Sequence, residues 1–140
     1  MCGIAGIFNY SPQKIETLAI LKKINQIQLS RGPDDSGVWQ SNCETISFAH
    51  TRLSIIDLSV NSKQPFSLNN EDYVITYNGE IYNYKEVKNF LLKKNIKFKS
   101  SSDTEVILQS YIYWGYNFVN HLRGMFAFAI WDNAKKELIL

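Results

Sequence analysis

The chain opens with Met1-Cys2-Gly3-Ile4-Ala5-Gly6-Ile7-Phe8, in which a cysteine directly follows the initiator methionine. Removal of Met1 would give Cys2 both a thiol and a free α-amine. The thiol has a reference pKa of about 8.5 and the amine one of about 7.7–8.0, so the amine can accept the thiol proton near neutral pH. A nucleophile with its own general base is suited to attack an acyl group. The alternative is that Cys2 is a small apolar residue at the start of a buried strand.

Size and composition indicate one globular domain over residues 1–140, because 45% of the residues are hydrophobic and 14% aromatic. Fifteen Lys and Arg against thirteen Asp and Glu leave a formal charge of +2. The charges are scattered, so we expect no nucleic-acid partner. No apolar run reaches the roughly 18 residues of a membrane helix, and the start lacks a basic signal region. We therefore expect a cytoplasmic location, with Cys2 and Cys43 both free and Cys43 structural.

Apolar periodicity and turn residues predict a mixed α and β order. Apolar residues recur at about every third position over 15–27, which predicts a helix. Two more helices are predicted over 84–94 and 103–115, the second with Ser102 and Glu105 at capping-box spacing. Strands are predicted over 4–8, 45–49, 73–77, 125–131 and 137–140. The Gly- and Pro-containing stretch 31–37 is predicted to be a loop.

Seven segments occur in the order of one known pattern. They are Met1-Cys2-Gly3-Ile4-Ala5-Gly6, Arg31-Gly32-Pro33-Asp34-Asp35-Ser36-Gly37, Ala49-His50-Thr51-Arg52-Leu53-Ser54-Ile55-Ile56-Asp57, Gln64-Pro65, Tyr77-Asn78-Gly79-Glu80-Ile81-Tyr82-Asn83, Ser102-Asp103-Thr104-Glu105-Val106-Ile107 and Leu122-Arg123-Gly124-Met125-Phe126-Ala127-Phe128. The set strongly resembles the class II glutamine amidotransferase domain of glutamine-hydrolysing asparagine synthetases, over essentially the whole chain. Glucosamine-phosphate synthases typically carry Trp-Ala-Thr-His-Gly after the arginine, where this chain has Leu53-Ser54-Ile55-Ile56-Asp57. The asparagine synthetase branch is therefore favoured.

This resemblance implies an α+β fold, the N-terminal-nucleophile hydrolase αββα sandwich of two antiparallel sheets flanked by helices. It also implies that Cys2 attacks the side-chain amide of glutamine and releases ammonia. The resulting thioester is hydrolysed to glutamate, and this glutaminase half needs no cofactor or metal. In such enzymes a synthetase domain uses ATP and Mg²⁺ to activate aspartate, which the ammonia then attacks. We expect a synthetase domain or chain as partner, and a homodimer is one possible assembly.

Asn78-Gly79 allows two interpretations. Between two apolar runs, Asn-Gly is the strongest short-range indication of a tight hairpin turn. By the resemblance, the Asn78 carboxamide and the Gly79 N–H donate hydrogen bonds to the oxyanion of the tetrahedral intermediate. One good donor of this kind contributes roughly 3–4 kcal/mol in other enzymes. The remaining segments favour the catalytic interpretation.

The resemblance also assigns the substrate-binding residues. Arg52, which alone would be interpreted as a surface charge, pairs with the α-carboxylate of glutamine through its planar two-pronged donor. Asp103, which alone would be a helix-dipole acid, binds the α-ammonium. Glu80 joins the polar lining, and Leu53 and Ile55 contribute backbone to the glutamine pocket. A cation and an anion at opposite ends of a zwitterion would select a free amino acid.

Three further features remain open. His50 lies close to Arg52, but the α-amine already serves as base, so a structural role is favoured over a catalytic one. We expect Arg31 and Asp34 to have structural roles in the loop.

The chain ends on an apolar strand at Leu140, so the domain is expected to continue. No pyrophosphate loop or acidic Mg²⁺ cluster occurs in these residues. The alternatives are an amidotransferase that feeds another acceptor, such as a sugar acid, and a truncated non-catalytic remnant.

Overall fold

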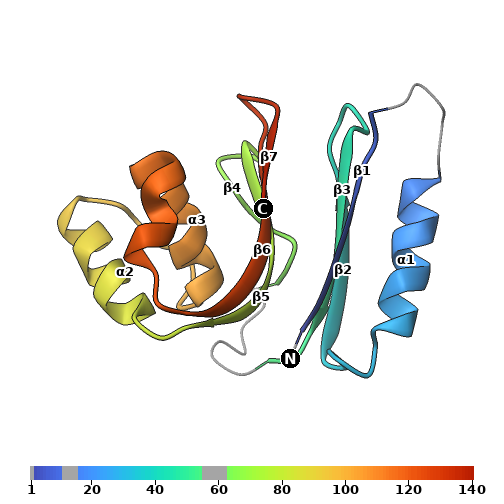
Figure 1. The fold of residues 1–140 in the computed structure, drawn as a ribbon, viewed down its shortest axis with the longest axis horizontal. Helices are drawn as coiled ribbons and strands as arrows, with labels where there is room; N and C mark the ends of the chain where they lie inside the picture. The colour runs from blue at the N-terminus through green and yellow to red at the C-terminus, as the bar shows by residue number, and fades with distance from the viewer. Residues whose placement is uncertain (1, 11–15, 55–62) are drawn as a thin grey trace.

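A computed structural model describes residues 2–10, 16–54 and 63–140. Its strands form two antiparallel sheets that face one another, and helices cover the outer face of each sheet (Figure 1). The layers therefore run helix, sheet, sheet, helix. This confirms the α+β sandwich that the sequence predicts.

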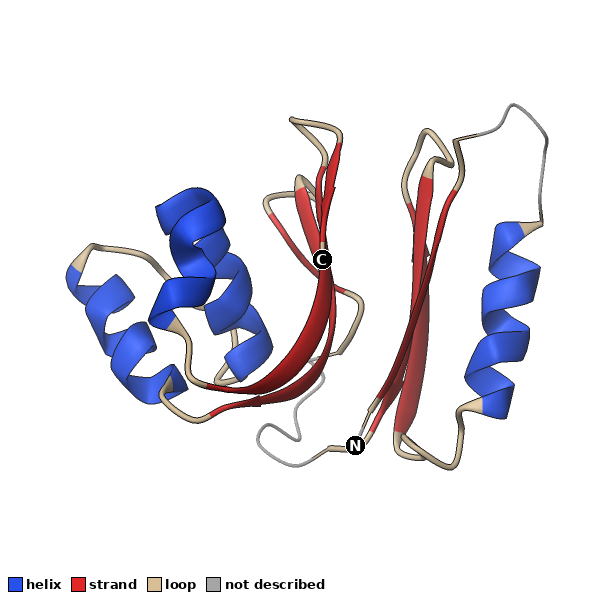
Figure 2. Cartoon of the chain, viewed as in Figure 1, coloured by secondary structure: helices blue, strands red, loops and turns tan. Residues whose placement is uncertain are grey.

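The first sheet has the strand order β1-β3-β2. Its strands are β1 (Gly3–Phe8), β2 (Asp35–Gln40) and the central β3 (Ile46–Arg52). Helix α1 (Thr17–Ile27) lies against its outer face (Figure 2) and buries Leu21 completely. The start of β2 lies inside the stretch predicted as a loop, so that prediction was wrong from residue 35 onward. The residues there are turn formers, but pairing with β3 supplies their backbone with partners that local sequence does not reveal.

The second sheet has the order β4-β5-β6-β7. Its strands are β4 (Phe66–Leu68), β5 (Tyr73–Ile81), β6 (Gly124–Asp132) and β7 (Glu137–Ile139). Strands β5 and β6 pair from Tyr73 opposite Asp132 to Ile81 opposite Gly124. Because β5 continues without interruption through positions 78 and 79, the hairpin-turn interpretation of Asn-Gly was wrong.

Helices α2 (Tyr84–Lys93) and α3 (Asp103–Trp114), followed by the 3-10 helix η2 (Gly115–His121), cover the second sheet. The Ser102 hydroxyl accepts a hydrogen bond from Thr104 N at 3.0 Å and begins α3 as a side-chain cap. The helix ends at Gly115, whose φ of 60° suits a residue without a Cβ atom.

The capping box predicted from Ser102 and Glu105 is only half formed. The fully buried Glu105 carboxylate accepts hydrogen bonds from Lys99 N at 2.9 Å and from Ser100 N and Oγ at 2.7 Å each. Ser102 N donates instead to Ser100 Oγ at 3.4 Å. Residues 99 and 100 lie within reach of the carboxylate, so it binds their backbone rather than that of Ser102.

The layer between the sheets changes from apolar to polar along β3. Ile46 and Phe48 belong to a small apolar cluster with Trp131 of β6. Two and four residues further on, the same strand face carries His50 and Arg52, both buried. The larger apolar core lies between the second sheet and its helices. The polar end of the inter-sheet layer is therefore the end at which the described chain begins (Figure 1).

Candidate active site

Cys2 lies at the polar end of the first sheet. It directly precedes β1, whose first residue Gly3 pairs with Thr51 of β3. This register places Cys2 beside the end of β3, where Leu53 N lies 3.4 Å and Leu53 O 3.7 Å from its Sγ atom. The half-buried thiol thus rests against the backbone of one of the predicted pocket residues.

Residues 31–34 hold this end of the sheet together. Arg31 Nε donates to Cys2 O at 3.3 Å, and Asp34 Oδ2 accepts from Ser54 N at 2.7 Å. A Cβ atom on Gly32 would lie 2.3 Å from the Thr51 carbonyl carbon, so glycine is required for this close approach. The loop therefore fixes both the segment of Cys2 and the segment that follows β3.

Arg52 is the last residue of β3 and is only 8% exposed. A buried guanidinium is unusual and needs anionic or hydrogen-bonding partners. Taken alone, an arginine is expected at the protein surface, and the burial of Arg52 shows that it does not lie there. Leu53 is half-buried next to it. Ile55, the third predicted residue of this segment, lies outside the described residues.

Asn78, Gly79 and Glu80 occupy the second half of β5. Asn78 is half-buried, while Gly79 and Glu80 are exposed. They pair with Ala127, Phe126 and Met125 of β6, respectively. A Cβ atom at position 79 would lie 2.4 Å from the Met125 carbonyl oxygen, so packing against β6 already requires glycine there.

Asp103 lies behind β5 at the first turn of α3 and is 5% exposed. Its Oδ2 atom accepts hydrogen bonds from the Tyr77 hydroxyl at 2.7 Å and from Ile81 N at 3.2 Å. Burial raises the pKa of this carboxyl above its usual range, and the two hydrogen bonds oppose that shift. The side chain is therefore a buried, oriented carboxylate and more than a helix-dipole acid.

Tyr77 connects these parts of the site. Burial and the neighbouring Asp103 carboxylate raise the pKa of its hydroxyl, and the charges of Glu80 and Cys2 raise this pKa further. Of these residues, Asp103 contacts the phenol directly, while Glu80 and Cys2 act on it through their charges. Sequence reasoning did not single out Tyr77, although it begins the Tyr77–Asn83 segment.

Gln64 is a second residue that sequence reasoning left without a role. Its Oε1 accepts from Tyr77 N at 2.7 Å, and its Nε2 donates to Thr104 Oγ1 at 3.3 Å. It therefore bridges β5 and the start of α3. The matching Gln64-Pro65 segment contained this residue, but only the tertiary structure shows what it bridges.

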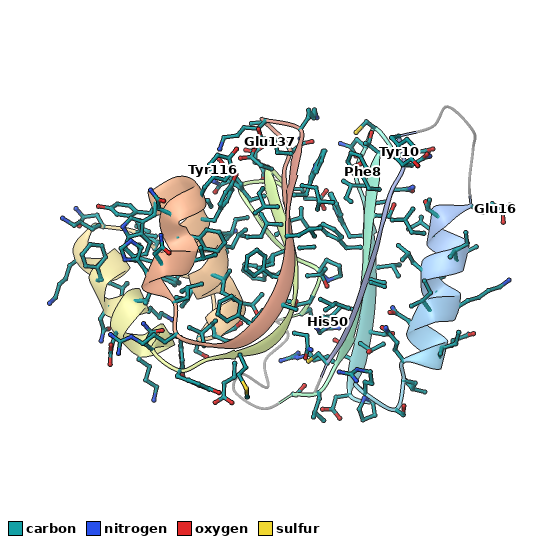
Figure 3. The ribbon with its side chains drawn as sticks, in the orientation of Figure 1. Phe8, Tyr10, Glu16, His50, Tyr116 and Glu137 are labelled. Atoms are coloured by element: carbon teal, nitrogen blue, oxygen red, sulfur yellow. The ribbon has the colours of Figure 1, made fainter. Side chains whose placement is uncertain are left out.

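His50 lies between the two sheets (Figure 3), where its Nε2 atom is 3.1 Å from Tyr77 O. Burial and, to a smaller extent, the Arg52 charge lower the pKa of this imidazole to about 4. The ring is therefore neutral at pH 7, and the tautomer with a proton on Nε2 donates to the Tyr77 carbonyl. Thr76 Oγ1 adds a second inter-sheet bond to Ala49 O at 3.2 Å. The bond between His50 and the Tyr77 carbonyl agrees with a structural role for His50.

Cys43 differs from Cys2 in its exposure to solvent. It is free, as is Cys2, but its side chain is exposed and not part of the core. Hydrogen bonds from Ser41 and Thr45 lower the pKa of its thiol to about 7. Within the described ranges, no three His, Cys, Asp or Glu side chains gather as metal ligands, and no helix there is long and apolar enough to cross a membrane.

Comparison with known proteins places the chain among amidotransferases. Two relatives are asparagine synthetases [glutamine-hydrolyzing] of Bacillus subtilis. Number 3 is 37% identical over 99% of this chain, and number 1 is 43% identical over 94%. The chain covers 22% and 21% of these relatives, so it spans about a fifth of their length.

The solved glutamine phosphoribosylpyrophosphate amidotransferase of Bacillus subtilis has a similar fold, with a TM-score of 0.74 at 20% identity. The similarity covers 93% of this chain and 35% of that protein. It confirms the predicted N-terminal-nucleophile hydrolase architecture. A family model described as a glutamine amidotransferase domain matches residues 1–140. The chain therefore belongs to the glutamine amidotransferase domain family.

Proposed function

We propose that this chain is the glutaminase part of a glutamine-hydrolysing asparagine synthetase. The family membership and the names of the relatives support the reaction class. The observation that carries the proposal is the position of Cys2, whose sulfur lies 3.4 Å from Leu53 N. Leu53 is the residue that follows the buried Arg52 at the end of β3. A nucleophile beside a buried cation is suited to an amino-acid amide.

The reaction begins when the Cys2 α-amine, freed by removal of Met1, accepts the thiol proton. Sγ then forms a bond to the side-chain carbonyl carbon of glutamine. The Asn78 carboxamide and the Gly79 N–H stabilise the resulting oxyanion. The carbon–nitrogen bond of the substrate amide breaks. The amide nitrogen takes the proton from the α-ammonium group of Cys2 and leaves as ammonia. Water adds to the thioester, the carbon–sulfur bond breaks, and glutamate and the thiol are released.

Substrate selection uses the two ends of the amino acid. Arg52 pairs with the α-carboxylate and Asp103 with the α-ammonium. Both side chains are more than nine-tenths buried, so their charges are less screened than they would be in water. Glu80, together with the backbone of Leu53 and of Ile55, completes the pocket.

The ammonia requires an acceptor that is activated elsewhere. We assign the ATP- and Mg²⁺-dependent activation of aspartate to a synthetase part outside these 140 residues, because the relatives are about five times as long as the matched region. The glutaminase chemistry itself uses only side-chain and backbone groups. We place the reaction in the cytoplasm.

A glutamine-derived diazoketone tests the proposal, because such a reagent alkylates the thiol that attacks glutamine. We expect mass spectrometry to find the adduct on Cys2, with Met1 absent. Cys2→Ala should abolish glutamine hydrolysis, while the matched variant Cys43→Ala retains it. Label on Cys43, or full activity in Cys2→Ala, would show that the proposal is wrong.

A further inference from the structure

The geometry points to Tyr77 as a positioning residue that holds the Asp103 carboxylate for the α-ammonium of the substrate. The inference rests on the proposed glutaminase function and deepens it, because it concerns how the same site distinguishes an amino acid from an acid that lacks the amine. Tyr77 itself need not touch the substrate.

Tyr77 is held at three points, once at its hydroxyl and twice at its backbone. It donates to Asp103 Oδ2 at 2.7 Å, while the backbone of the same residue is held at both polar atoms. Its N–H donates to Gln64 Oε1 at 2.7 Å, and its carbonyl oxygen lies 3.1 Å from His50 Nε2. Since the phenol also packs in the apolar core, the hydroxyl has little freedom to move. It is therefore a rigid donor for a carboxylate.

The charge state of the pair is suited to this role. Burial, Asp103, Glu80 and Cys2 all raise the pKa of the Tyr77 hydroxyl, so the hydroxyl keeps its proton at neutral pH. Burial raises the pKa of the Asp103 carboxyl, and the hydrogen bond from Tyr77 is the largest influence that lowers it. The tyrosine thus favours the charged form that an ammonium group requires.

A second buried tyrosine–aspartate pair shows what Asp103 lacks. Tyr111 donates to Asp132 Oδ2 at 2.9 Å, and Lys135 Nζ lies 3.5 Å from the same carboxylate. Within the described part of the chain, Asp103 has no such ion pair. A buried carboxylate is normally paired with a cation. The α-ammonium of glutamine is the cation that would complete the pair at Asp103.

Two substrates and two variants test this inference in the whole protein. The substrates are glutamine and glutaramate, which has the same amide and carboxylate but no amine. We expect Tyr77→Phe to raise KM for glutamine about tenfold with a smaller change in kcat, and to leave glutaramate hydrolysis unchanged. The matched variant Tyr111→Phe should alter neither substrate's KM. Tyr77→Phe combined with Asp103→Asn should bind glutamine no more weakly than Asp103→Asn alone.

Equal losses on both substrates would overturn the inference, because they would indicate a merely structural role, and so would an unchanged KM for glutamine. If Tyr77→Phe fails to fold, Asp103→Asn must show the same difference between the substrates, and its absence would also overturn the inference. A wild-type protein that binds glutamine without hydrolysing it would refute the proposed function alone. The same comparison would then use dissociation constants.

Discussion

Replacing His50 with glutamine is expected to make the folded protein less sensitive to acid. His50 is 1% exposed, and burial together with the smaller effect of the Arg52 charge lowers its pKa to about 4. The hydrogen bond to Tyr77 O and the Asp35 carboxylate act in the opposite direction. In the unfolded chain the pKa is about 6.5. The unfolded state therefore binds more protons between these values, and stability falls as the pH falls through that window.

The size of the effect follows from the two pKa values. The full difference corresponds to about 3 kcal/mol, of which about 2 kcal/mol is lost between pH 7 and pH 5. A domain of this size has a free energy of unfolding of roughly 5–15 kcal/mol. The loss is thus large enough to measure in a conventional denaturation experiment.

Urea unfolding, followed by tryptophan fluorescence at pH 7 and pH 5, would measure this loss. The chain has two histidines, so His121→Gln, at an exposed position, is the matched control. Glutamine at position 50 keeps a donor for Tyr77 O but cannot titrate. Because the pKa of Asp103 is raised in the folded protein, this carboxyl adds stability as the pH falls. Its effect on the free energy of unfolding is the same in all three proteins and cancels in the comparison. We expect wild type and His121→Gln to lose about 2 kcal/mol more than His50→Gln. Equal losses in all three proteins would refute the reasoning.

Two further substitutions test the two strands of the site. Gly79→Ala would bring a Cβ atom within 2.4 Å of Met125 O and 2.6 Å of Phe126 Cα, so we expect it to lower the free energy of unfolding by about 1–3 kcal/mol. An unchanged thermal midpoint would contradict this packing. Arg52→Lys keeps the charge but loses the two-pronged donor, so KM for glutamine should rise roughly tenfold. An unaltered KM in steady-state assays would argue against its pairing with the substrate carboxylate.

Local sequence was informative wherever an element depends on its own residues. The helix that begins after Ser102 and ends at Gly115 is an example, because a side-chain cap and a glycine with positive φ act within one turn. Local sequence did not predict the structure correctly where the hydrogen-bond partners of a segment are distant in the chain. The start of β2 and the passage of β5 through Asn78-Gly79 both contain turn-forming residues that pairing with other strands holds extended.

The sequence by itself indicated the family of this protein, because seven segments in a fixed order resemble glutamine amidotransferase domains, and the family model that matches residues 1–140 confirms this. Only the tertiary structure decided which residues of these segments lie in contact. Antiparallel pairing of β1 with β3 places Cys2 against Leu53, and packing of α3 behind β5 places Asp103 on the Tyr77 hydroxyl. Contacts between residues so far apart in the chain depend on strand register and helix packing, which no local pattern of residues encodes.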